Sequence, residues 1–139
     1  FYQDQEPATA WSGDGILMAF AEGADATTGT EIGISIYPQN SDNCAIYCYS
    51  HTEDASKTAK LMNGEVKAKC DGIYTVYEVK IPWSEIFHDG YKAKSGEVIR
   101  WSLLYNENDG SGRMGFLQYG AGIGGVKSVA QYLDLELKK

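Results

Sequence analysis

The sequence is poor in the residues that mark common catalytic, metal-binding and nucleic-acid-binding sites. Its 139 residues include two His, three Cys and three Pro, and only 12 Lys and Arg against 19 Asp and Glu. The resulting net charge of −7 argues against nucleic acid or an anionic membrane surface as a partner, because both attract clustered Lys and Arg. No apolar run approaches the roughly 18–20 residues of a transmembrane helix.

The few cysteines and histidines form no recognisable site. Cys44, Cys48 and Cys70 are an odd number, which excludes a complete disulfide framework. Cys44 and Cys48 share a face of one predicted strand about 13 Å apart, too far for a bridge, so we expect them to pack as small apolar residues. His51 and His88 lie in polar segments without metal-ligand spacing, and we expect both to be solvated.

Motifs of catalysis are also lacking. The sequence has no G-x-S-x-G elbow and no P-loop. Residues 120–125 read GAGIGG but do not join a strand to a helix, which predicts a tight loop rather than a dinucleotide site. The paired carboxylates of a glycoside hydrolase are a spatial feature, so a hydrolase fragment stays the least favoured alternative. We expect a protein that is not an enzyme.

Glycine, tyrosine and short alternating segments are abundant. The 16 Gly and ten Tyr are typical of aromatic-rich strands joined by tight turns. Period-two alternation predicts about eight strands, at residues 16–22, 32–37, 44–50, 65–70, 73–81, 98–105, 113–119 and 133–138. Between them we expect a turn at residues 38–43, a loop or helical turn at 51–60, a hairpin turn at Asp71-Gly72 and one helical turn at 83–87. The prediction is one all-β domain, a β-sandwich spanning residues 1–139.

Two aromatic residues stand outside the alternating pattern. Trp11 lies among small and polar residues in ATAWSGDG, so it is either a platform for a flat ligand or a lid over the core. Tyr119 ends a predicted strand just before a glycine run, where its ring can stand free. An aromatic face can bury the C–H face of a sugar while polar neighbours bind its hydroxyls. By contrast, we expect Trp83 and Trp101 to pack in the core.

The segment NENDGSG at residues 106–112 concentrates oxygen donors. Asn106, Asn108 and Asp109 offer amide and carboxylate oxygens on a predicted loop, which are ligands that Ca²⁺ prefers. The segment lacks the spacing and the terminal Glu of an EF-hand, so a plain acidic turn is the alternative. Glu78 is either a buried structural acid or a surface residue, and the pattern does not decide between them.

Three blocks of the sequence resemble the family-9 carbohydrate-binding modules of secreted bacterial xylanases and related glycanases. They read WSGDGILMAF at residues 11–20, VYEVKIPWSEI at 76–86 and NENDGSGRMGFLQYG at 106–120, in the order of the family and across most of the chain. The resemblance implies a jelly-roll-like β-sandwich, bound structural calcium and an aromatic slot for a plant-type glycan such as xylan or cellulose, often at the reducing end of the glycan chain.

The resemblance also assigns residues to the slot. Trp11 and Tyr119 match its two rings, although Tyr119 stands where the family usually has Trp. Leu17 stands where a polar side chain is expected. The matching blocks further assign Asp14, Arg113 and Gln118 to sugar binding.

The same resemblance implies a secreted or cell-surface protein whose partners are a glycan and the other domains of a parent glycanase. Family members begin with strands upstream of the matched part, so we expect an upstream segment to complete the sandwich. The alternative function is a structural or domain-docking sandwich that has lost its sugar slot.

Overall fold

A computed structural model describes residues 1–37 and 43–139 and confirms the all-β prediction. The predicted turn at 38–43 therefore lies almost wholly outside the described residues. The described strands are β1 (Gly15–Glu22), β2 (Thr30–Ile36), β3 (Cys44–Ser50), β4 (Lys60–Leu61), β5 (Glu65–Cys70), β6 (Thr75–Lys80), β7 (Val98–Asn108), β8 (Arg113–Tyr119) and β9 (Leu133–Glu136). The short helices are η1 (Pro7–Ser12), η2 (Ala55–Lys57), α1 (Trp83–Ile86) and η3 (Val129–Gln131), and none of them could span a membrane.

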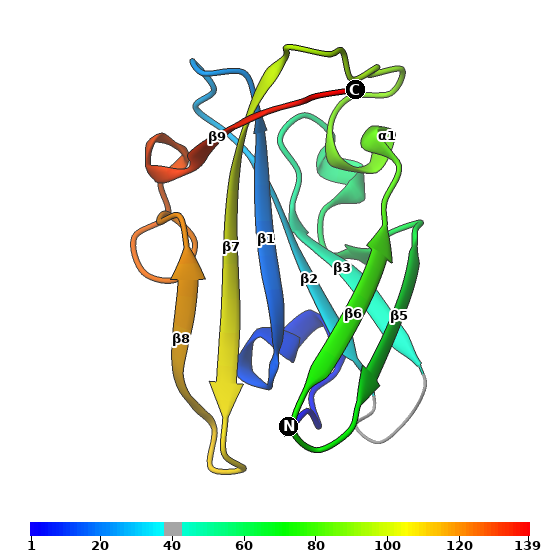
Figure 1. The fold of residues 1–139 in the computed structure, drawn as a ribbon, viewed down its shortest axis with the longest axis vertical. Helices are drawn as coiled ribbons and strands as arrows, with labels where there is room; N and C mark the ends of the chain where they lie inside the picture. The colour runs from blue at the N-terminus through cyan, green and yellow to red at the C-terminus, as the bar shows by residue number, and fades with distance from the viewer. Residues whose placement is uncertain (38–42) are drawn as a thin grey trace.

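The strands form two sheets of unequal size (Figure 1). The large sheet has the order β4-β3-β2-β1-β7-β8, and β9 pairs with the first residues of β7. The small sheet is the β5–β6 hairpin. Its turn forms where Asp71-Gly72 predicts it, because the Asp71 carboxylate accepts hydrogen bonds from the backbone N–H groups of Ile73 and Tyr74 at 2.9 and 2.8 Å.

The main core lies between the large sheet, the hairpin and α1. Its buried residues are Ile32, Ile34, Ile46, Ile86, Phe87, Tyr91 and Ile99. Trp83 packs against this cluster as predicted, with its ring stacked on Phe87 at 5.7 Å between centroids. A smaller cluster on the opposite, outer face of the large sheet contains Leu17, Ala19, Leu104 and Ile123.

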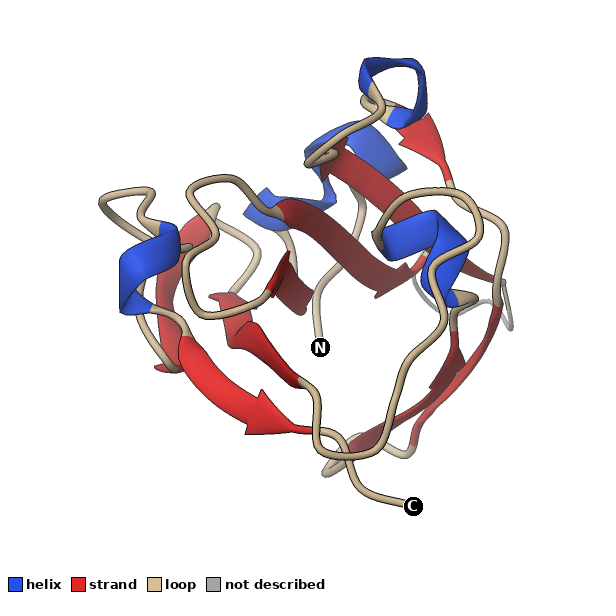
Figure 2. Cartoon of the chain, turned by 90° about the horizontal axis from the view of Figure 1, so that it is seen from above, coloured by secondary structure: helices blue, strands red, loops and turns tan. Residues whose placement is uncertain are grey.

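The second layer leaves part of the inner face of the large sheet uncovered. Figure 2 shows the large sheet as a curved layer. The described second layer opposite it consists of the β5–β6 hairpin, α1 and the segment after α1, which contributes Phe87 and Tyr91 to the core. On β1 the outward residues are buried, whereas the inward residues Ile16, Met18 and Phe20 are only half-buried. Trp101, which the sequence predicts to be a core residue, is half-buried for the same reason.

Several large apolar side chains share this uncovered inner face. Cross-strand pairing places Tyr105 opposite Leu117, Trp101 opposite Leu133, and Ile99 opposite Leu135. Residues paired in this way point to the same face of a sheet. The exposed members are Tyr105, Leu117, Tyr119, Leu133 and Leu135. We refer to these five residues as the open apolar face.

The open apolar face should bind an apolar dye. We expect residues 1–139 alone to enhance the fluorescence of 8-anilinonaphthalene sulfonate, and the double substitution Leu117→Ser/Tyr119→Ser to reduce the enhancement, because the dye binds exposed apolar surface. Leu61→Ser is the matched control, since Leu61 is an exposed apolar residue on β4. Equal dye fluorescence in all three proteins would contradict the expectation.

Candidate functional site

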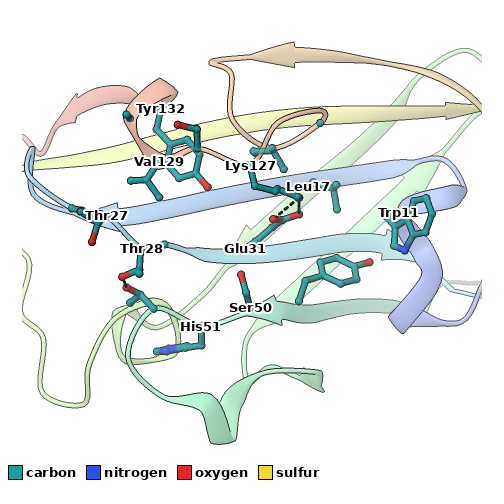
Figure 3. A pocket seen from close by; sticks show the side chains of 18 of the residues that line it. Trp11, Leu17, Thr27, Thr28, Glu31, Ser50, His51, Lys127, Val129 and Tyr132 are labelled. Atoms are coloured by element: carbon teal, nitrogen blue, oxygen red, sulfur yellow. Dashed lines mark hydrogen bonds and ion pairs between the residues drawn. The ribbon is translucent and has the colours of Figure 1, made fainter.

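A cleft of about 1030 Å³ lies on the outer face of the large sheet (Figure 3). Its floor comes from β1, β2 and β3, and its rim from η1 and the segment after β8. Figure 3 shows the Trp11 indole at one end and Thr28 and His51 at the other. The lining also includes Leu17, Glu31, Tyr49, Arg113, Ile123, Lys127 and Tyr132.

Trp11 presents its ring to solvent at the cleft. It lies in the 3₁₀ helix η1 and is 45% exposed, which favours the ligand-platform interpretation over that of a lid on the core. Leu17, where the family resemblance leads one to expect a polar side chain, is buried and forms part of the cleft floor. The end of the cleft near Trp11 therefore combines an exposed aromatic ring with an apolar base.

A buried glutamine fixes η1 against the start of β1. The Gln3 side-chain amide donates hydrogen bonds to the carbonyl oxygens of Ala10 at 3.0 Å and Asp14 at 2.8 Å. The intervening Gly13 leaves room for this side chain, because a Cβ on Gly13 would lie 2.3 Å from Gln3 Oε1. The backbone on both sides of Trp11 is thereby held by one side chain.

Asp14 is part of the same support and does not contact the cleft. Its carboxylate is buried and accepts hydrogen bonds from the backbone N–H groups of Tyr2 at 2.6 Å and Asn108 at 2.8 Å. Asn108 in turn donates its side-chain N–H to the Ser12 carbonyl at 2.7 Å. The prediction that Asp14 binds the sugar is therefore wrong, because its oxygens are committed to the backbone.

An ion pair lies midway along the cleft. Lys127 Nζ is 2.6 Å from both carboxylate oxygens of Glu31. The Glu31 side chain is 13% exposed, whereas that of Lys127 is 59% exposed. Tyr49 and Tyr132 also line the cleft, and burial raises the pKa of each hydroxyl to about 12. Both phenols are therefore protonated at neutral pH. The Tyr49 hydroxyl donates its hydrogen bond to the carbonyl oxygen of Pro7 at 3.1 Å, whereas the Tyr132 hydroxyl can donate one to a ligand.

His51 at the far end is more enclosed than the sequence suggests. Its Nδ1 accepts hydrogen bonds from the backbone N–H groups of Asp54 at 2.9 Å and Glu53 at 3.2 Å, which places the proton of the neutral ring on Nε2. Burial lowers the His51 pKa, and the nearby Lys57 lowers it further. His51 is therefore a neutral ring at pH 7, whereas His88 is exposed as expected.

Tyr119 lies on the opposite face of the sheet from the cleft. Tyr119 is paired with Leu103, and Leu103 with Met18. Paired residues share a face, so Tyr119 and Met18 point the same way. Leu17 precedes Met18 and therefore points to the other face, where it lines the cleft with Trp11. The predicted clamp of Trp11 and Tyr119 is wrong, and the Tyr119 ring contacts Trp101 instead, at 5.8 Å.

The remaining predicted sugar residues divide between the cleft and the surface. Arg113 lines the cleft near Trp11, since its register partner Asn108 bonds to Ser12. Gln118 is exposed on β8 and is not among the residues lining the cleft. Glu78, the residue that the pattern left undecided, is exposed on β6.

Two of the three predicted calcium ligands, Asn108 and Asp109, have other roles. β7 extends to Asn108, so Asn106 and Asn108 are buried strand residues and only residues 109–112 form the turn. The side-chain oxygen of Asn108 accepts backbone N–H groups from Gly110 at 2.7 Å and Gly112 at 3.3 Å, and that of Asp109 accepts one from Ser111 at 2.9 Å. These oxygens hold a tight hairpin turn, and this segment does not fit a calcium site in this arrangement.

Sequence reasoning missed Glu31, Lys127, Tyr49 and Tyr132. Strand alternation could have indicated the positions of Glu31 and Tyr49. Glu31 precedes the inward-facing Ile32, and Tyr49 follows the inward-facing Cys48. Both therefore belong to the outer face. No local signal joins Glu31 to Lys127, since 96 residues separate them.

Removing the charge of Asp14 should destabilise the hydrogen-bonded backbone that holds η1 and Trp11 in place. In Asp14→Asn one carboxylate oxygen becomes an amide NH₂, which cannot accept one of the two backbone hydrogen bonds. We expect the free energy of unfolding to fall by about 1–3 kcal/mol, measured in urea. Asp109→Asn is the control. Asp109 is exposed, and an asparagine there keeps a side-chain oxygen that can accept the backbone hydrogen bond from Ser111. An equal effect of both substitutions would contradict the role given to Asp14.

With the geometry of the cleft described, comparison with known proteins adds no assignment: no protein-family profile, no curated protein and no solved structure matches the chain.

Proposed function

We propose that the domain binds carbohydrate through the outer-face cleft and catalyses no reaction. The observation that carries the proposal is the exposed Trp11 indole at the end of an elongated cleft whose other lining groups are mainly hydrogen-bonding side chains. Such a ring offers a flat apolar face of the kind that stacks on a sugar. The resemblance of the surrounding sequence to family-9 carbohydrate-binding modules supports the same ligand class.

The polar lining suits sugar hydroxyls. A hydroxyl both donates and accepts hydrogen bonds, so a sugar site needs acceptors and donors together. Glu31 supplies carboxylate acceptors, while Lys127 supplies ammonium donors and Tyr132 a phenolic donor. The shape of the cleft is preformed by β-strands, which limits the entropy lost on binding.

The same proposal places the protein at the cell surface or outside the cell, as part of a glycan-degrading polypeptide. The ligands that we propose are plant-type glycans such as xylan and cellulose or their oligosaccharides. Because Trp11 is the only one of the two predicted rings in the cleft, a slot closed by two rings is not part of this proposal.

Trp11→Ala should weaken glycan binding without affecting stability. A glycan array on residues 1–139 first identifies a ligand, and calorimetric titration then compares the variants. By analogy with aromatic stacking on bases, at roughly 1–3 kcal/mol per ring, the affinity should fall about 5- to 150-fold. The melting temperature should change little, because the indole is exposed.

Tyr119→Ala is the matched control for this experiment. Its ring is also exposed, yet it lies on the opposite face of the sheet, so glycan affinity should stay unchanged. A loss of affinity in Tyr119→Ala but not in Trp11→Ala would contradict the assignment of the cleft. Absence of any glycan ligand on the array would contradict the proposed function itself.

Calcium remains a proposal that a thermal melt can test. Extracellular calcium modules bind the ion with a Kd of about 10⁻⁴–10⁻³ M, and an ion that binds only the folded state raises the melting temperature. If the family resemblance holds for calcium, the melting temperature in millimolar calcium should exceed that in EDTA. Coincident melting curves would remove calcium from the account.

Domain docking is a second candidate function, favoured by the open apolar face. β6 has one strand neighbour in the described part of the chain, β5, so its other edge can accept a further strand. We propose that a strand preceding Phe1 in the parent polypeptide pairs with β6 and covers the open apolar face. Phe1 lines one small cavity with Thr75, the first residue of β6, and with Tyr105 of the open apolar face. Figure 1 shows the N-terminus next to the start of β6. A longer form of the polypeptide should then lose the dye fluorescence expected for residues 1–139.

A further inference from the structure

We propose that the sugar unit that stacks on Trp11 carries a carboxylate, and that Arg113 binds it. The ligand class is a glycan containing uronic acid. This inference rests on the proposed carbohydrate-binding function and narrows its ligand class. The observation behind it is that an arginine in the cleft has no anionic partner among the described residues.

Arg113 lies at the same end of the cleft as Trp11. It begins β8 opposite Asn108, and the Asn108 side chain is bonded to the carbonyl of Ser12, the residue after Trp11. The Arg113 guanidinium carbon lies 4.7 Å from the centre of the Phe116 ring. Stacking on a ring holds the plane of a guanidinium while leaving its edges to make hydrogen bonds.

One edge of this guanidinium has no partner in the described part of the chain. Arg113 Nε and Nη2 are both shielded from solvent, and no described residue accepts a hydrogen bond from either atom. No described carboxylate forms an ion pair with Arg113. Lys127, the other cation of the cleft, differs because both oxygens of Glu31 contact it. Arg113 is thus the cleft cation whose charge no described side chain balances.

A second unpaired polar group lies next to Arg113 in the sheet. Asn106 is opposite Phe116 in the strand register and is fully buried. Neither its side-chain oxygen nor its side-chain nitrogen has a hydrogen-bond partner among the described residues. Buried donors and acceptors without partners cost free energy. Asn106 is not among the residues that line the cleft, so Arg113 is the unpaired group that a ligand in the cleft can reach.

A carboxylate satisfies this edge better than a hydroxyl does. The Nε and Nη2 hydrogens of arginine form a planar fork that matches the two oxygens of a carboxylate. A neutral hydroxyl would accept one hydrogen bond and leave the charge unbalanced. Arg113 lines the cleft but its Nε and Nη2 atoms are shielded from solvent, so the proposal requires the Arg113 side chain to move when the carboxylate binds.

The acidity of the whole protein does not oppose this contact strongly. The net charge is −7, but the Debye length is about 8 Å at physiological ionic strength, so distant carboxylates are largely screened. Within the cleft the charged lining residues are Glu31, Arg113 and Lys127, which sum to one positive charge with His51 neutral. The side chains that line the cleft therefore carry one more positive than negative charge.

The test compares an acidic oligosaccharide with its neutral form. The probes are a xylo-oligosaccharide that carries one glucuronic acid unit and the same compound after reduction of the carboxyl group to an alcohol. We expect the acidic probe to bind wild-type protein at least roughly tenfold more tightly in calorimetric titration. Arg113→Gln should remove this preference, and Arg113→Lys should retain part of it, since a lysine keeps the charge but loses the fork.

Lys80→Gln is the matched control for loss of one positive charge. Lys80 is exposed on β6 and pairs with Glu65, away from the cleft, so the preference for the acidic probe should persist. Thermal melts of each variant show whether it folds. The wild-type comparison of the two probes needs no variant and shows whether the cleft prefers a carboxylate. If Arg113→Gln fails to fold, Arg113→Lys tests the part played by Arg113, because it keeps the charge and loses only the fork.

The outcomes separate this inference from the proposed function. Equal binding of both probes, with loss of both in Trp11→Ala, would overturn the uronate assignment and leave carbohydrate binding standing. An equal loss of both probes in Arg113→Gln would also overturn it, because Arg113 would then bind a hydroxyl. Binding of neither probe, together with an empty glycan array, would overturn both proposals.

Discussion

The buried carboxylate of Asp14 is the contact on which the geometry of the cleft depends. It joins the N-terminal segment to β7 by accepting backbone hydrogen bonds from Tyr2 and Asn108, a residue 94 positions later. The two bonds fix the start of β1 and, with Gln3, the helix that carries Trp11. This carboxylate is buried and does not line the cleft, so its contribution to the site is to hold the backbone in position.

The two faces of the large sheet then have different roles. Because side chains alternate along β1, Leu17 points into the cleft while Met18 points into the main core. The outer face is covered by η1 and the segment after β8, which leaves a cleft between them. The inner face is covered only in part by the β5–β6 hairpin and α1. The proposed ligand site and the proposed docking surface therefore lie on opposite sides of one sheet and need not interfere.

Much of the fold was predictable from local pattern, and the site only in part. Alternation and the Asp71-Gly72 turn predict the strands and the hairpin, because both features depend on neighbouring residues. Of the residues predicted to bind sugar, Trp11 and Arg113 line the cleft, and their part in sugar binding stays a prediction. The sequence pattern did not predict that β7 continues through Asn106 and Asn108. A run of polar residues is typical of a loop, and the strands that pair with this part of β7 cannot be identified from the local sequence.

The predicted pairing of Trp11 with Tyr119 failed for a different reason. Which face a side chain occupies depends on the register between β8 and β7, and a shift of one residue reverses it. The ion pair of Glu31 with Lys127 is similarly set by tertiary structure. Such contacts between distant segments decide the composition of the cleft, and the sequence carries no local trace of them.

The central claim, that the outer-face cleft binds carbohydrate at Trp11, can be tested most directly by nuclear magnetic resonance. The protein has three tryptophans and hence three indole N–H signals. During titration with a glycan ligand, the account predicts that the Trp11 signal shifts in a saturable way while those of Trp83 and Trp101 stay in place. A shift of the Trp101 signal without that of Trp11 would place the ligand on the opposite face and contradict the account.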